Sequence, residues 1–131
     1  MVLLDTHVAV WLASDYSLLR PTELEVILDP DNEIVVSAVS IWEIGIKWSK
    51  QYRSGARKGP IDSREMLSAL RATKVVVLPL TAEHASAELR VPLSHGDPFD
   101  ILLLTIAQEL NGRLLTRDAD LRGHPLAYHA S

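Results

Sequence analysis

Four acidic residues stand in apolar surroundings, where a carboxylate is energetically unfavourable unless it is paired or has a function. Asp5 and Asp118 each follow a short apolar stretch, and Glu43 and Asp100 lie on strongly apolar helical segments. A buried, unpaired carboxylate is unfavourable, and carboxylates gathered together repel one another unless a cation lies between them. Oxygen ligands without cysteine or clustered histidine favour Mg²⁺ or Mn²⁺, which can activate water to hydrolyse a phosphodiester bond. We therefore predict a divalent-metal site formed by Asp5, Glu43, Asp100 and Asp118.

Each of these positions also allows a purely structural interpretation. Asp5 is a good N-cap for the helix expected after it, and Lys47 follows Glu43 at the spacing of a helical ion pair. Asp97 is directly followed by a proline, as is typical of a residue that caps a helix, so Asp97 is only a secondary candidate for the metal. The sequence leaves both interpretations open at each position.

Short apolar stretches alternate with helical segments along the chain. We expect strands at Val2–Leu4, Ile34–Val36, Val75–Leu78 and Leu114–Thr116, with 125–128 as a candidate fifth. The helices between them are expected to begin near residues 7, 22, 38, 63, 81 and 97, and those from 38 and 81 to reach about 51 and 90. This alternation is typical of an α/β fold with a mainly parallel, four- to five-stranded sheet flanked by helices. Ligands of such sheets bind beyond the carboxyl ends of the strands, where the acids stand.

The length of 131 residues and the hydrophobic share of 47% suit a single domain over residues 1–131. The absence of cysteine excludes disulfides and thiolate metal sites and fits a cytoplasmic protein. We expect no signal peptide, since the N-terminus has no basic segment, and no membrane span, since no apolar run is long enough. Helical spacing places four large side chains in the expected core: Trp11, Trp42, Leu102 and Leu103.

The net charge of −4 means that any contact with nucleic acid must be local. One dense basic stretch runs from Lys47 to Lys58 and is interleaved with Trp48 and Tyr52. Basic and aromatic side chains together can follow phosphates and stack on bases. The candidates for contact with nucleic acid are Lys47, Lys50, Arg53 and Arg57. A solvated helix face, or an anchor for an acidic partner, is the other interpretation.

Four ordered segments of this chain resemble the PIN-domain ribonucleases, and among them the VapC-type toxins of bacterial toxin–antitoxin pairs. The segments are Leu3–His7, Ser37–Ile44, His95–Asp100 and Leu115–Asp118. Each is weak alone, but the ordered set spans nearly the whole chain and is specific. One departure is Ile101, which stands where members of this subgroup often carry a basic residue.

The resemblance implies a three-layer PIN fold and a metal-dependent endoribonuclease that acts as a toxin. It implies that Mg²⁺ (or Mn²⁺) is bound by the catalytic acids Asp5, Glu43, Asp100 and Asp118, with Thr116 and Thr6 in support. It further implies an RNA substrate, a cognate antitoxin protein and a homodimer.

Other classes that place acids at strand ends fit less well. A phosphatase of the haloacid-dehalogenase class needs a second Asp two residues after Asp5, where this chain has His7. A receiver domain needs an Asp at the end of the third strand, which here runs into Leu78, Pro79 and Leu80. A PIN fold that only binds a partner lacks support because all four acids are present. A DNA or structure-directed nuclease outside a toxin–antitoxin pair remains the alternative, since metal-binding acids do not distinguish the sugar.

Overall fold

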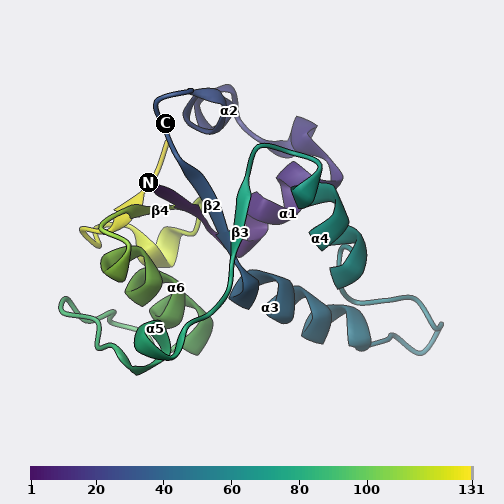
Figure 1. Cartoon of the computed structure of the whole chain (residues 1–131). Coiled ribbons are helices and arrows are strands. Elements are labelled where there is room, and N and C mark those ends of the chain that lie inside the picture. The colour runs from purple at the N-terminus through teal and green to yellow at the C-terminus, as the bar shows by residue number, and fades with distance from the viewer. Residues whose placement is uncertain (131) are drawn as a thin grey trace.

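A parallel five-stranded sheet lies at the centre of the computed structural model, which describes residues 1–130 (Figure 1). The strands are short and apolar: β1 (Val2–Leu4), β2 (Ile34–Ser37), β3 (Val76–Leu78), β4 (Arg113–Leu115) and β5 (Ala127–Tyr128). Their order across the sheet is β3-β2-β1-β4-β5, and every neighbouring pair is parallel. The predicted α/β fold is confirmed, and the candidate fifth strand is present.

Helices cover both faces of this sheet, with α5 and α6 on one side and α1 and α4 on the other (Figure 1). The helices, with two short 3-10 turns, are α1 (Thr6–Ser14), η1 (Tyr16–Leu18), α2 (Pro21–Leu28), α3 (Ala38–Ser49), α4 (Ser63–Arg71), α5 (Ala82–Ser86), α6 (Pro98–Glu109) and η2 (Ala119–Leu121). None of the helices within residues 1–130 has both the length and the apolar character needed to cross a membrane.

Alternation along the strands creates two separate hydrophobic cores. Leu3 and Leu114 point to the face covered by α6, where they pack with Leu103 and Leu104. The next residue along β1, Leu4, points to the other face, where its core contains residues of α1 and α4. Both faces of the central strands are buried, which explains why they are apolar throughout.

The strand order reverses at β1, and this reversal positions the candidate site. The chain passes from β1 to β2 and β3 on one side, then crosses back to place β4 and β5 on the other. The carboxyl ends of β1 and β4 therefore flank a topological switch point, the place where ligands bind in open parallel sheets. Asp5 follows β1 directly, and Thr116 follows β4.

Several predicted boundaries differ from the structure. The second helix begins at Pro21 with Arg20 as its N-cap, because a proline is well suited to the first helical position. The helix expected to reach Arg90 ends at Ser86. The helix after β2 ends at Ser49, because the chain turns into a small hairpin in which the Lys58 amide donates to the Lys50 carbonyl.

The expectation that Trp42 lies in the core is wrong. Trp42 is 70% exposed, whereas Val39 and Ile44 of the same helix are buried. The α3 helix is apolar over more of its circumference than the sheet and its neighbours cover, so periodicity alone could not identify the buried side. Leu103 is buried as expected, and Trp11 is partly buried.

Candidate active site

Asp5 lies at the centre of the candidate site, between the end of β1 and the start of α1. Its side chain is 6% exposed, and both carboxylate oxygens accept hydrogen bonds. The Thr6 amide donates to Oδ1 at 2.8 Å, and the Thr116 hydroxyl donates to Oδ2 at 2.6 Å. Burial raises the pKa of Asp5, while these two hydrogen bonds act in the opposite direction. Asp5 thus caps α1, as its structural interpretation proposed, and also faces the switch point.

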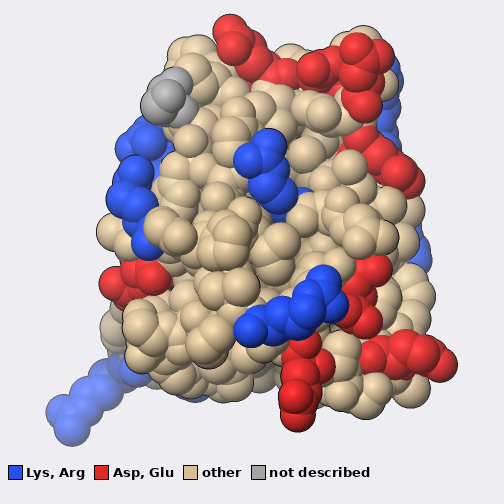
Figure 2. Space-filling model, turned by 90° about the vertical axis from the view of Figure 1, so that its left-hand side faces the viewer, with Lys and Arg blue, Asp and Glu red and all other residues tan. Residues whose placement is uncertain are grey.

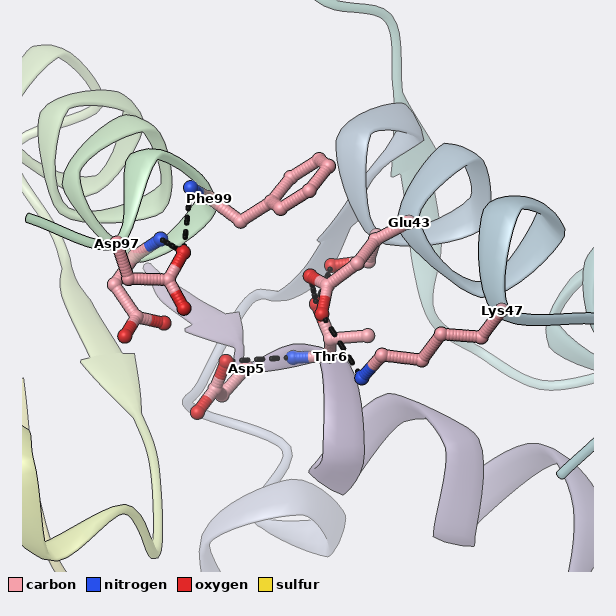
Figure 3. Close-up of polar contacts among 8 residues, drawn as sticks. Asp5, Thr6, Glu43, Lys47, Asp97 and Phe99 are labelled. Atoms are coloured by element: carbon pink, nitrogen blue, oxygen red, sulfur yellow. Dashed lines mark hydrogen bonds and ion pairs between the residues drawn. The ribbon is translucent and has the colours of Figure 1, made fainter. Parts of the chain in front are cut away.

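Glu43 reaches the same region from α3, which begins at the end of β2. Ser37 caps this helix by accepting from the Val39 amide, as a helix start is expected to be capped. The Thr6 hydroxyl donates to Glu43 Oε1 at 2.9 Å (Figure 3). Because Thr6 uses its proton there, the Ser40 hydroxyl donates to Thr6 across 2.9 Å. Ser40 and Thr6 therefore orient one oxygen of Glu43.

The other oxygen of Glu43 forms the ion pair that helical spacing allows. Lys47 Nζ lies 3.3 Å from Glu43 Oε2. Figure 3 shows the Lys47 side chain extended back along α3 to reach Glu43. The positive charge nearest to the candidate metal ligands is thus supplied by Lys47, one of the RNA-contact candidates.

The start of α6 brings two more acids to this edge of the sheet. Asp97 caps the helix, with its Oδ1 accepting from the amides of Phe99 at 2.9 Å and Asp100 at 3.4 Å. Burial raises the pKa of Asp100 to about 7, with further contributions from the negative charges of Asp97, Asp5 and Asp118. These carboxylates come from three different parts of the chain and lie near enough to repel one another.

Asp118 stands just beyond β4 and is held by its own turn. Its carboxylate accepts from the Asp120 amide at 2.9 Å and thereby caps η2. Its amide donates to the Thr116 hydroxyl at 3.0 Å, and its carbonyl lies 2.9 Å from His129 Nε2. Thr116 therefore contacts both Asp5 and Asp118.

The acids predicted from the sequence are brought to one edge of the sheet. Asp5 and Asp97 cap helices, and Glu43 pairs with Lys47, so the structural interpretations also hold. Asp100 is the exception, because the cap of its helix is Asp97. Within residues 1–130, no three His, Cys, Asp or Glu side chains are arranged closely enough to hold a metal ion as they stand. Metal ligation by these acids stays a prediction.

The donor set nevertheless suits a hard divalent cation. All the gathered side chains offer carboxylate oxygens, which Mg²⁺ and Mn²⁺ prefer. Burial raises the pKa values of Asp5 and Asp100, and the negative charges of neighbouring carboxylates raise them further. A cation bound among these carboxylates would remove that repulsion, so the residues fit such a group.

The other basic candidates lie beyond the end of α3. Residues 50–58 form the small hairpin, in which Tyr52 and Ala56 are hydrogen-bonded, and this part of the chain extends to the lower right of Figure 1. The aromatic rings are already engaged by cations. The Arg57 guanidinium lies 5.6 Å from the Trp48 ring centre, and Lys58 Nζ lies 5.1 Å from that of Tyr52. We call residues 50–58 the basic hairpin.

Charge is distributed differently on the face shown in Figure 2, which is the left-hand side of Figure 1. There the Lys and Arg side chains stand in separate groups among uncharged residues, and acidic side chains gather along the upper and right-hand edges (Figure 2). In the sequence, the dense basic segment is the stretch from Lys47 to Lys58, which includes the basic hairpin.

Sequence reasoning missed three polar residues that the structure connects to the site. Ser40 precedes Glu43 by three positions, and this spacing on one helix could have revealed it. Arg117 and Glu23 form an ion pair over 94 positions, for which the sequence carries no local signal. Arg117 stands between Thr116 and Asp118, so this ion pair lies next to two residues of the candidate site in the chain.

Comparison with known proteins identifies the family of this chain. The PIN domain family matches residues 2–125. The chain belongs to the PIN-domain family. Ribonuclease VapC22 of Mycobacterium tuberculosis (strain ATCC 25618 / H37Rv) is 33% identical over 124 residues, which are 94% of this PIN domain and 91% of the relative.

Two solved structures share the fold of this PIN domain. A toxin-antitoxin complex from Klebsiella pneumoniae matches with a TM-score of 0.64 and 16% identity, over 100% of this chain and 98% of that one. VapBC2 from Rickettsia felis, bound to a DNA fragment from its promoter, matches with a TM-score of 0.65 and 18% identity, over 98% of both chains. At such identities the likeness concerns the fold alone.

Proposed function

We propose that this PIN domain is a metal-dependent endoribonuclease and the toxin of a toxin–antitoxin pair. The observation that carries the proposal is the gathering of Asp5, Asp100 and Asp118 at the switch point, where burial and the negative charges of neighbouring carboxylates raise the pKa of Asp100 to about 7. The relative that is 33% identical is named a ribonuclease, which favours RNA as the substrate. The alternative of a DNA or structure-directed nuclease is not favoured by these relatives.

The residues that would hold Mg²⁺ or Mn²⁺ are Asp5, Glu43, Asp100 and Asp118, with Asp97 as the secondary candidate. When bound, the metal supplies an activated water for attack on phosphorus and stabilises the leaving oxygen. The protein prepares the site by holding ligand oxygens in place. Thr116 and the Thr6 amide orient Asp5, and the Thr6 hydroxyl orients Glu43.

Binding of RNA to this acidic protein requires local positive charge. We assign this role to Lys47, Lys50, Arg53 and Arg57, which run from the candidate site into the basic hairpin. Lys47 pairs with Glu43 at 3.3 Å, so it lies at the border between the acids and the exposed surface. Phosphate contacts of this kind fix the position of the RNA backbone and carry no sequence preference by themselves.

The decisive experiment compares cleavage of tRNA, rRNA and single-stranded DNA by the purified protein with Mg²⁺ or Mn²⁺ present. We expect RNA to be cut, EDTA to abolish cutting, and Asp5→Asn to be inactive. Asp120→Asn is the matched control, since Asp120 is an exposed acid just beyond the site. Cleavage of DNA with intact RNA would favour the alternative, and cleavage that survives EDTA would contradict the metal-dependent mechanism.

The partners follow from the same proposal. The two similar structures are of toxin–antitoxin complexes, and we propose that this protein also has a cognate antitoxin and forms a homodimer in the cytoplasm. Expression of the protein alone should arrest growth, and Asp5→Asn should not. Co-expression of a protein encoded beside it should restore growth. Sedimentation equilibrium should give twice the mass of 14.5 kDa.

A further inference from the structure

Arg117 connects the site to a part of the molecule that carries none of the candidate ligands. It stands between Thr116 and Asp118, and its side chain pairs with Glu23 of α2. Its Nε donates to Glu23 Oε2 at 3.1 Å, and its Nη2 donates to Glu23 Oε1 at 2.5 Å. This paired geometry, in which two N–H groups meet two carboxylate oxygens, is the strong and directional form of an ion pair.

Two further contacts hold the Arg117 guanidinium in place. Its Nη2 also donates to the Leu18 carbonyl of η1 at 3.0 Å. Its Cζ lies 4.2 Å from the ring centre of Trp11 on α1, within the range of a cation–π interaction. Arg117 thus joins α1, η1 and α2 to the segment that follows β4.

Glu23, the partner of Arg117, is buried and is itself held by hydrogen bonds. It is the third residue of α2, its side chain is 1% exposed, and Oε1 also accepts from the Arg20 amide at 2.7 Å. Burial alone would raise the pKa of Glu23, but the hydrogen bonds from Arg117 and Arg20 and their positive charges outweigh it and lower the pKa. A buried ionised carboxylate without its partner strongly destabilises the folded protein. Arg117 is therefore held in one position by Glu23.

We propose that Glu23 is a positioning residue for the metal site and acts through Arg117. By fixing Arg117 it fixes the two neighbours of Arg117 in the chain, Thr116 and Asp118. The proposal rests on the proposed function, because positioning has a consequence only if these acids bind a metal ion.

The hydrogen bonds around Thr116 explain how a small displacement of Arg117 would reach two candidate metal ligands. The Thr116 hydroxyl donates to Asp5 and accepts from the Asp118 amide, so one atom sets the relation between two candidate ligands. A shift in the backbone at Arg117 moves both of its neighbours together. Residues that orient metal ligands commonly change metal affinity by about ten- to a hundredfold when they are replaced.

Replacement of Glu23 by glutamine tests this proposal, since Glu23→Gln keeps the size of the side chain and removes its charge. Glu25→Gln is the matched control, because it makes the same change on the exposed side of the same helix. We expect Glu23→Gln to weaken Mn²⁺ binding by about tenfold in calorimetry. We also expect it to lower kcat for RNA with little change in KM. The control should alter neither quantity.

A second variant tests the proposal independently, in case Glu23→Gln does not fold. Arg117→Lys keeps the positive charge beside Glu23 and loses the paired N–H groups. It should weaken Mn²⁺ binding in the same direction by a smaller factor, with Arg122→Lys, an exposed arginine, as its control. All measurements are made at a temperature where thermal unfolding shows each variant to be folded.

A double-mutant cycle with Asp118→Asn separates positioning from simple stabilisation. If Glu23 acts through the segment that carries Thr116 and Asp118, Glu23→Gln should cause a smaller further loss of Mn²⁺ affinity once Asp118 is replaced, because only the path through Thr116 to Asp5 remains. It should still lower the melting temperature. Variants that melt earlier but bind Mn²⁺ like the wild type would overturn the inference and leave the proposed function intact. A wild-type protein that neither binds Mn²⁺ nor cuts RNA would overturn both.

Discussion

The Thr116 hydroxyl donates a hydrogen bond of 2.6 Å to the Asp5 carboxylate, although 111 positions separate the two residues. The contact exists because β4 pairs directly with β1, with Leu115 opposite Leu4, so the residues that follow the two strands emerge side by side. The chain crossing that places β4 beside β1 also creates the switch point. Asp5 is therefore oriented by the topology of the sheet as well as by its own helix.

The first prediction concerns Asp100. We expect Asp100→Asn to reduce RNA cleavage by more than about a hundredfold, because a bound metal ion supplies several kcal/mol of transition-state stabilisation. The same change should raise the melting temperature of the metal-free protein, since it removes a charge that is disfavoured by burial and by the neighbouring carboxylates Asp97, Asp5 and Asp118. Cleavage assays and thermal unfolding in EDTA measure the two effects.

Asp97→Asn is the control for that prediction. Asparagine caps a helix about as well as aspartate does, so the start of α6 should remain intact and cleavage should persist. If Asp100→Asn were fully active and Asp97→Asn inactive, the third metal ligand would be Asp97 instead.

The second prediction concerns the pH dependence of stability without metal. The pKa of Asp100 is about 7 in the folded protein and near its ordinary value of 3.8 when unfolded. Between these values the folded state binds a proton that the unfolded state does not, so stability rises as the pH falls through about 7 and levels off near 4. The raised pKa of Asp5 acts in the same direction. We expect the melting temperature to increase by about 5 °C over this range.

Measurement of the melting temperature against pH, in EDTA, tests the second prediction. The increase should be clearly smaller in Asp100→Asn, in which the raised pKa of Asp5 still contributes. A metal-free wild type whose stability falls steadily from neutral to mildly acidic pH would show that the pKa of Asp100 is not raised in the folded protein.

Features encoded by neighbouring residues could be predicted from the sequence. The step from Leu4 to Asp5 marks both the end of a buried strand and an acid at the sheet edge, and both are observed. The start of α6 was equally clear, because Asp97 and Pro98 are typical of a capped helix. Alternating strands and helices were sufficient to predict the parallel sheet.

Features that depend on contacts over long distances in the chain could not be predicted in this way. The Glu23–Arg117 pair lacks any local pattern, since it forms only once α2 and the segment after β4 are packed together. The exposure of Trp42 depends on which side of α3 its neighbours cover. How closely the acids approach one another is likewise a property of the assembled sheet and helices.

The third prediction uses the pair of Lys47 and Glu43. Lys47→Gln removes a cation that lies 3.3 Å from a candidate ligand, so it should tighten Mn²⁺ binding. The effect should be about twofold, since ion pairs of this helical spacing contribute about 0.3–0.5 kcal/mol. The same change should weaken RNA binding. Calorimetry with Mn²⁺ and RNA-binding titrations give the two quantities, and Lys74→Gln, at an exposed lysine before β3, is the control.

An equal loss of Mn²⁺ and RNA affinity in Lys47→Gln would contradict this prediction, because it would indicate that Lys47 supports the site structurally. Unchanged RNA binding would remove Lys47 from the set of RNA-contact residues and leave its pairing with Glu43 as its role.

The last prediction concerns the basic hairpin. A protein with a net charge of −4 can attract RNA only where positive charge is concentrated. Replacement of Lys50, Arg53 and Arg57 by alanine should weaken RNA binding. It should also reduce the slope of log affinity against log salt by up to about 0.7 for each phosphate of a single strand that the protein no longer neutralises. Mn²⁺ binding should not change, because these residues lie beyond the end of α3.

A triple variant of equal charge provides the control for the hairpin. Arg64, Arg71 and Lys74 are exposed basic residues outside the hairpin, and their replacement by alanine makes the same change in net charge. Arg57 also donates to the Trp48 carbonyl at 3.3 Å, so circular dichroism should verify that the hairpin variant is folded. If the hairpin variant and the control show the same decrease in affinity and in salt dependence, only net charge matters. The basic hairpin would then be a solvated surface or a contact for another protein, and RNA would enter the site from another side.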